Sequence, residues 1–141
     1  MTKVQKPGIL IKQIKERLNG QKDIQFAYLY GSAVYDPTLP GSDIDVAVYL
    51  TPSKPEGYSK REAELLAYLV TQLHTDSIDL RILNMLPLVF QYGIIKEGIL
   101  ILSHDEKRRT EFETSVMIRF FELKPYLDEY QQMLSRRIRG V

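Results

Sequence analysis

Two aspartates separated by one residue are the side chains of this sequence best suited to chemistry. Asp43 and Asp45 open the segment 42–50, where apolar residues take every second position: Ile44, Val46, Val48 and Leu50. This period predicts a β-strand with one buried face and both carboxylates on the other, about 7 Å apart along the strand. Aspartate is disfavoured in strands and like charges repel, so the pair needs a compensating cation unless it is simply a solvated face. Because Mg²⁺ prefers carboxylate and phosphate oxygens, the spacing predicts a magnesium site.

A glycine-serine pair precedes the aspartates, with ten residues between them. Gly31 and Ser32 follow an apolar and aromatic run, residues 24–30, that is typical of a strand. Glycine lets the backbone approach a ligand closely, and the serine hydroxyl and neighbouring N–H groups can cradle phosphate oxygens. A helix beginning at residues 33–35 would add its positive end to the site. Gly-Ser alone is a common turn pair, but before the carboxylate strand it predicts a site for a metal-bound nucleoside triphosphate.

A third carboxylate lies in another alternating segment, residues 77–83. Apolar residues take one parity there, and Asp79 and Arg81 take the other. If this strand lies beside the Asp43 strand, Asp79 shares its face, as a metal ligand or as a general base that accepts a proton from an attacking hydroxyl. The alternative is an ordinary exposed strand residue. For Arg81, a phosphate contact and an ion pair with an aspartate are equally open.

The composition excludes several classes of protein. The 141 residues fit one domain with a real core, and the net charge of +1 gives no support for direct nucleic-acid binding. The absence of cysteine excludes disulfides and thiolate chemistry, and two histidines are too few for a multi-histidine metal site. No apolar run is long enough to span a membrane, and the N-terminus lacks the apolar stretch of a secretory signal. We therefore expect a cytoplasmic protein.

Eight elements are predicted, in the order helix, strand, strand, helix, strand, helix, strand, helix. Helices are expected at 8–19, 59–74, 86–97 and 105–139, and strands at 24–30, 43–50, 77–83 and, as a short buried strand, 99–102. Ser59 is expected to cap the second helix, with Glu62 as its capping-box partner. Pro125 is expected to kink or split the last helix. We expect a single domain, with a catalytic core at 1–104 and a C-terminal helical extension at 105–141.

Taken together, these motifs resemble a known family. Gly31-Ser32, ten residues, Asp43-x-Asp45 and a later strand carrying Asp79 are similar to the nucleotidyltransferase signature of the DNA polymerase β-like superfamily. The short length and the flanking Tyr-Leu-Tyr and Val-Ala-Val runs resemble the minimal nucleotidyltransferases. Among these, the chain most resembles the MntA antitoxins, which are encoded beside HEPN-domain toxins of the HepT type.

The resemblance covers essentially the whole chain and is strongest over residues 26–50 and 77–83. It implies an α+β fold in which helices flank a mixed β-sheet, followed by a C-terminal helical segment, with the active site on one face of the sheet. It also implies the site residues: catalytic and metal-binding Asp43, Asp45 and Asp79 with two Mg²⁺ ions, Asp79 also acting as base, and a nucleotide or phosphate site at Gly31, Ser32, Ser42 and Arg81.

The function implied by the resemblance is that of an antitoxin. Such proteins are similar to protein adenylyltransferases that move AMP from ATP to a tyrosine hydroxyl of the partner toxin and silence its RNase activity. A HEPN-family toxin and ATP are the implied partners. Neither His74 nor His104 follows an arginine at the spacing of the HEPN motif Arg-x(4–6)-His, so this chain is not the toxin. Two alternatives stay open: the same chemistry on a small molecule such as an aminoglycoside, and an antitoxin that only binds its toxin.

Overall fold

A four-stranded sheet with the spatial order β3-β2-β1-β4 forms the centre of the molecule. The computed structural model describes residues 7–31 and 43–139. β1 pairs antiparallel with β2 and β4, and β2 pairs parallel with β3, so the sheet is mixed and the fold is α+β, as predicted. The described elements are α1 (Pro7–Asn19), β1 (Ile24–Tyr30), β2 (Ile44–Leu50), α3 (Pro55–Leu73), β3 (Ile78–Ile82), the 3₁₀ turn η1 (Leu83–Met85), α4 (Leu88–Glu97), β4 (Ile99–Ser103) and α5 (Glu106–Ile138).

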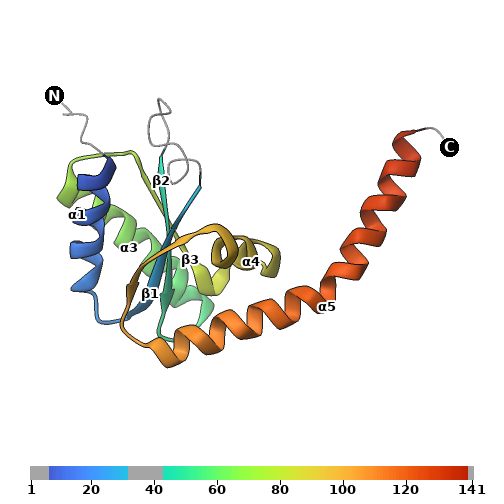
Figure 1. The fold of residues 1–141 in the computed structure, drawn as a ribbon. Coiled ribbons are helices and arrows are strands. Elements are labelled where there is room, and N and C mark those ends of the chain that lie inside the picture. Colours follow the sequence, from blue (N-terminus) through green and yellow to red (C-terminus); the bar gives the residue numbers. More distant parts are fainter. Residues whose placement is uncertain (1–6, 32–42, 140–141) are drawn as a thin grey trace.

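Helices cover both faces of the sheet (Figure 1). On one face, buried apolar residues of α1 and α3 pack against the parity of β2 and β3 that the sequence predicted to be buried. On the other face, Phe26 and Ala47 pack with Ile94 of α4, and Phe112 of α5 closes this second cluster. The prediction that β2 buries only one face is therefore wrong. Ala47 has the parity of the aspartates and is nevertheless fully buried, because α4 and the first turns of α5 cover the sheet there.

Two local predictions fail for physical reasons. α3 begins at Pro55, a residue whose fixed φ suits the first helical turn, and no side chain caps it, so Ser59 lies inside the helix. Glu62 accepts a hydrogen bond of 3.0 Å from the backbone N–H of Ile82 instead of serving a capping box. The last strand is also less buried than predicted, since Ile99 at the sheet edge is 50% exposed.

α5 is a single helix of 33 residues that continues through Pro125. Asp105 caps its start by accepting a hydrogen bond of 2.9 Å from the N–H of Arg108. Figure 1 shows that the helix runs past the sheet and bends partway along, as expected where proline removes a backbone hydrogen bond. Proline therefore bends the helix without splitting it. Residues 128–139 are all exposed, so the outer part of α5 stands clear of the sheet.

No helix among the described residues combines the length and the apolar character needed to cross a membrane. The division of the chain into a core at 1–104 and an extension at 105–141 stays a prediction.

Candidate active site

The parallel pairing of β2 with β3 brings two of the predicted carboxylates together. The register places Asp45 opposite Asp79. Paired residues of neighbouring strands project from the same face, so both carboxylates lie on one side of the sheet. Asp43 is exposed, directly precedes β2 and has the parity of Asp45. Burial raises the pKa of Asp45, and repulsion from the carboxylates of Asp79 and Asp43 raises it further. The three acidic groups therefore form one electrostatic cluster at this end of the strands.

Gly31 lies against this cluster from the end of β1. Its φ of +89° is rarely adopted by residues with a side chain. A Cβ built on residue 31 would collide with a carboxylate oxygen of Asp45 and would lie 3.1 Å from the Cγ of that residue. In the structure the backbone of Gly31 approaches Asp45 closely, and its predicted approach to a phosphate stays a prediction. Ser32 and Ser42, the other two residues of the predicted phosphate site on these segments, lie outside the described residues.

Arg81 and Tyr30 complete the polar surroundings. The Nε of Arg81 lies 3.4 Å from an Oδ2 oxygen of Asp79, so the ion pair that the sequence left open is present. The charge of Asp79 raises the pKa of Arg81. Burial, with repulsion from Asp45 and Asp79, raises the pKa of Tyr30 to about 12. The Tyr30 hydroxyl therefore stays protonated at neutral pH and can act as a hydrogen-bond donor beside the carboxylates.

The donor set suits Mg²⁺, because hard oxygen ligands and mutual repulsion both favour a divalent cation. The side chains are not yet arranged as a complete site: within residues 7–31 and 43–139, no group of three acidic or histidine side chains is placed to hold a metal ion. Asp79 is held by Arg81, and Asp43 is exposed at the strand end. Metal binding would therefore require the three carboxylates to turn toward a common point, and a two-ion site stays a prediction.

A pocket of about 650 Å³ opens beside the carboxylates. Its sheet side is formed by Tyr30, Gly31, Asp79 and Arg81, and its other side by the start and inner face of α4. No motif in the sequence marks the α4 residues as part of a site. The available signal was Gly93, a glycine inside an apolar helical run, which is unfavourable in a helix unless it has another use.

A comparison with protein-family models decides the family. The model described as "Polymerase beta, Nucleotidyltransferase" matches residues 12–107, a span that contains the whole carboxylate cluster. The chain belongs to this nucleotidyltransferase family. The sequence matched none of the curated proteins with which it was compared.

Solved structures similar to this nucleotidyltransferase include toxin–antitoxin complexes. A crystal structure of the toxin–antitoxin MntA–HepT matches at 20% identity with a TM-score of 0.65, over 93% of this chain and 98% of the other. A toxin–antitoxin structure with AMP-PNP matches at 20% identity with a TM-score of 0.67, over 94% and 98% of the two chains. A tri-AMPylated Shewanella oneidensis HEPN toxin in complex with an MNT antitoxin matches at 18% identity with a TM-score of 0.63, over 91% and 98%. At these identities the likeness shows a shared fold.

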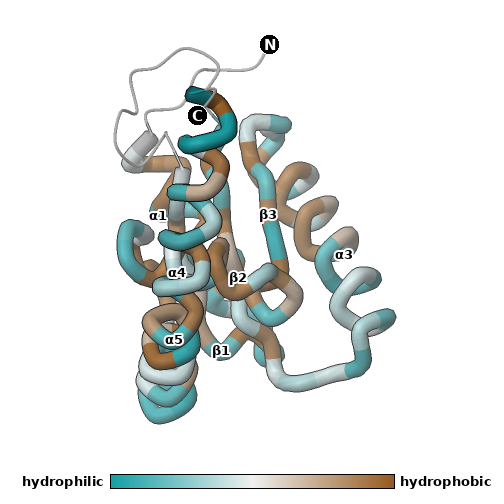
Figure 2. The backbone as a smooth tube through the Cα atoms, turned by 90° about the vertical axis from the view of Figure 1, so that its right-hand side faces the viewer, coloured by the Kyte–Doolittle hydropathy of each residue, from teal (hydrophilic) through white to brown (hydrophobic). Residues whose placement is uncertain are grey.

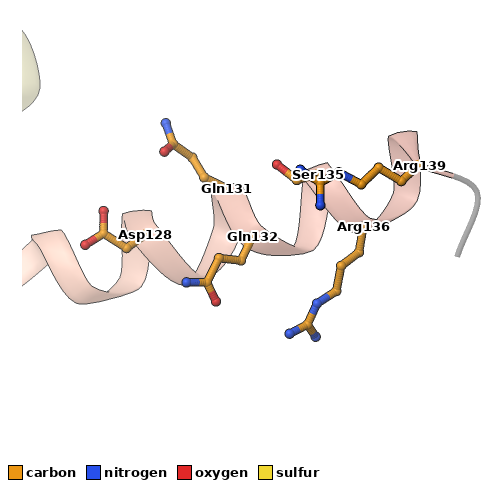
Figure 3. A pocket seen from close by; sticks show the side chains of 6 residues that line it. All are labelled: Asp128, Gln131, Gln132, Ser135, Arg136 and Arg139. Atoms are coloured by element: carbon orange, nitrogen blue, oxygen red, sulfur yellow. The ribbon is translucent and has the colours of Figure 1, made fainter.

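Two further hollows of this nucleotidyltransferase lie along α5, away from the carboxylates. Figure 3 shows the one near the C-terminal end, where every side chain that lines it comes from the same helix. The other lies between Thr110 and Arg119 and is likewise formed by α5 alone. Hollows on one exposed helix enclose no ligand, so of these three hollows, all formed by residues that the structure describes, the pocket beside Asp79 fits a substrate best.

Proposed function

We propose that this nucleotidyltransferase is an antitoxin that transfers AMP from ATP to a tyrosine hydroxyl of a HEPN-family toxin. The observation that carries the proposal is the register that sets Asp45 beside Asp79 on one face, next to an open pocket. Membership of the nucleotidyltransferase family supplies the reaction type. One similar structure contains AMP-PNP and another an MNT antitoxin with a tri-AMPylated HEPN toxin, and these descriptions of other proteins support ATP and a toxin as the partners here.

The chemistry assigns two roles to the three carboxylates, metal binding and, for Asp79, proton acceptance as well. The tyrosine oxygen bonds to the α-phosphorus of ATP, the bond from that phosphorus to the pyrophosphate oxygen breaks, and the tyrosine proton passes to Asp79. Asp43, Asp45 and Asp79 would hold the metal ion, which would in turn bind the triphosphate. Bound Mg²⁺ would supply neutralisation of the charge that develops on the attacking and leaving oxygens. Gly31, with Ser32 and Ser42, binds phosphate oxygens, and Arg81 is the cationic side chain available to the nucleotide.

Intact-mass measurement of the toxin tests this proposal. A HEPN-family toxin, the proposed partner, is incubated with ATP, Mg²⁺ and the nucleotidyltransferase, and it is expected to gain the mass of one or more adenylate groups. Asp45→Asn should abolish the gain. Asp76→Asn, which changes an exposed aspartate just before β3, is the matched control and should leave it intact. A toxin that gains no mass with the unaltered protein, or gains the same mass with Asp45→Asn, would contradict the mechanism.

A second candidate function, neutralisation by binding alone, is favoured by the outer part of α5. Tyr126, Tyr130 and Ile138 are 70%, 61% and 85% exposed, which is unusual for large apolar side chains placed on one helix. Such a helix can dock on a partner, and docking is compatible with catalysis. Cell growth in the presence of the toxin separates the two functions: protection by Asp45→Asn would favour binding alone, and loss of protection would favour AMP transfer.

A further inference from the structure

The pocket beside Asp79 has two unlike sides. Its sheet side carries charge, from Asp79 and Arg81. Its helix side is mostly apolar and is formed by Leu86, Pro87, Val89, Phe90, Gly93 and Ile94, with Glu97 at the end of α4. Phe90 is 64% exposed and Val89 is 47% exposed, so the fold leaves this apolar surface open to solvent. A pocket with one ionised end and one apolar side fits a ligand that is itself apolar with a polar tip.

Gly93 lies inside α4 and lines the apolar side of the pocket. Among the described glycines, Gly31 is the one with positive φ, so the backbone of residue 93 does not require glycine. Packing does not require it either, because no atom lies within 4 Å of the position that a Cβ would take. A glycine inside a helix is less favourable than alanine by about 1 kcal/mol. What the glycine does provide is open space along the pocket, beside Phe90.

Glu97, at the end of α4, is the polar side chain of this helix that lines the pocket, whereas Gln91 and Tyr92 make their contacts elsewhere. Gln91 is buried and donates a hydrogen bond of 3.0 Å to the carbonyl of Leu83. Tyr92 stacks on Phe120 of α5 with a centroid distance of 3.7 Å. Between Leu86 and Ile94, therefore, the pocket side offers no side-chain group that could hydrogen-bond the edge of a nucleobase. A flat aromatic ring that needs no such hydrogen bonds fits this side better.

We propose that this pocket is the acceptor subsite and that it takes the aromatic ring of a tyrosine side chain presented by a protein. The inference rests on the proposed function and adds to it the place where the acceptor binds. The ring packs against Phe90 and occupies the space over Gly93, and its hydroxyl is directed toward Asp79. Among the three clustered carboxylates, Asp79 is the one that lines the pocket, which matches its role as the proton acceptor. Phe90 and Gly93 are then residues that determine the acceptor, while ATP binds on the side of Asp43 and Asp45.

Filling the pocket tests this assignment. In Gly93→Leu, the new side chain enters open space and should block the ring without harming the helix. The Michaelis constant for the HEPN partner in the AMP-transfer assay should rise at least about tenfold, which corresponds to about 1.4 kcal/mol. The affinity for the fluorescent nucleotide TNP-ATP should stay within about twofold, and the melting temperature should not fall, since glycine in a helix interior is unfavourable.

The matched control is Gly8→Leu. Gly8 is also a helical glycine with no atom within 4 Å of its Cβ position, and it lies in α1, away from the pocket. This variant should leave the Michaelis constant, the nucleotide affinity and the melting temperature unchanged. Phe90→Ala should raise the Michaelis constant for the partner in the same way as Gly93→Leu, whereas Phe90→Trp, which keeps an aromatic surface, should retain most of the activity.

Three other outcomes would overturn the inference, and the last of them would also overturn the proposed function. If Gly93→Leu transfers AMP with an unchanged Michaelis constant for the partner, the ring does not bind there and the inference is overturned, while the proposed function stands. If Gly93→Leu loses affinity for TNP-ATP, the pocket holds the nucleobase and the inference is again overturned. If the unaltered protein transfers no AMP to its partner in the same assay, the proposed function fails and the inference fails with it.

Discussion

Two regions of the molecule differ in the kind of group they expose. The β2–β3 edge carries crowded carboxylates, and the outer part of α5 carries exposed apolar side chains. At the edge, Asp45 faces Asp79 across two paired strands, and its pKa is raised by burial and by repulsion. On the outer part of α5, large apolar side chains such as Tyr130 and Ile138 are exposed, and Figure 2 shows hydrophobic and hydrophilic residues alternating along this helix. A bound cation offsets the repulsion between crowded carboxylates, whereas a protein partner buries exposed apolar surface. The comparison assigns the chemistry and the proposed acceptor subsite to the edge, and the wider docking surface to the helix.

The largest effect is expected at the edge. Asp45→Asn removes a ligand charge and should lower kcat/KM for AMP transfer by about 10³-fold, as the loss of a group that stabilises the transition state does. The affinity for the toxin, measured by isothermal titration calorimetry, should stay within about twofold, because this residue lies away from α5. A variant that lost toxin binding together with activity would show that the edge is also a docking surface.

Gly31→Ala should have the next largest effect. The alanine Cβ would require both a rarely adopted φ and movement of the Asp45 carboxylate, so the free energy of unfolding should fall by about 1–3 kcal/mol. Urea denaturation measures the change. The matched control is Gly20→Ala, where the nearest atom to a Cβ is a backbone oxygen at an ordinary 3.8 Å. Equal stability of the two variants would mean that Gly31 does not lie against Asp45.

A smaller effect is expected on the outer part of α5. Replacing Tyr126 and Tyr130 together by alanine should weaken toxin binding by about tenfold, because exposed tyrosines commonly anchor interfaces. The free energy of unfolding should change by less than about 0.5 kcal/mol, since both side chains are exposed in the free protein. AMP transfer at saturating toxin should keep its kcat. Gln132→Ala on the same helix is the control. Unchanged toxin affinity in the double variant would contradict a docking role for α5.

The smallest effect concerns an ion pair away from both regions. Arg61 donates hydrogen bonds of 2.7 and 2.9 Å to Asp23, and these lower the pKa of Asp23 below its ordinary value of 3.8. A lowered folded pKa means that this stabilisation is present above about pH 4 and is lost as the pH falls through the folded pKa. Arg61→Ala should therefore reduce the free energy of unfolding at pH 7 by about 1 kcal/mol or less, because the pair is partly exposed, and the difference should shrink in acid.

Lys60→Ala provides the comparison for that pair. The Lys60 side chain is 80% exposed, and its Nζ lies 4.0 Å from Oε1 of Glu64. Replacing it should therefore leave the free energy of unfolding unchanged at every pH. Chemical denaturation of both variants between pH 2 and 7 separates the two cases. An Arg61→Ala difference that grew as the pH fell would contradict the assigned direction of the Asp23 pKa.

The parts of this molecule that the sequence could predict depend on local periodicity. The alternation around Asp45 and around Asp79 determines which side chains share a face, whatever the rest of the chain does. The helix α3 connects β2 to β3, and such a crossover allows the two strands to pair in parallel once they are neighbours. Gly31 could be assigned a close backbone approach because no other residue type allows it.

The remaining features depend on contacts between distant segments. Nothing near Glu62 in the sequence indicates that it accepts a hydrogen bond from Ile82, twenty residues later. The burial of Ala47 requires α4 and α5 to cover the second face of the sheet. Phe90 becomes part of a pocket only when the start of α4 lies beside the ends of β1 and β3. Such arrangements are set by tertiary packing, which a single sequence does not display.

The central claim is that Asp43, Asp45 and Asp79 form one metal–nucleotide site. Titration of Mn²⁺ in the presence of AMP-PNP, followed by electron paramagnetic resonance, tests it most directly. Replacing any one of the three by asparagine should weaken Mn²⁺ binding at least about tenfold, since each removes a charged ligand, whereas Asp76→Asn should bind as the unaltered protein does. Unchanged Mn²⁺ affinity in both Asp45→Asn and Asp79→Asn would contradict the account.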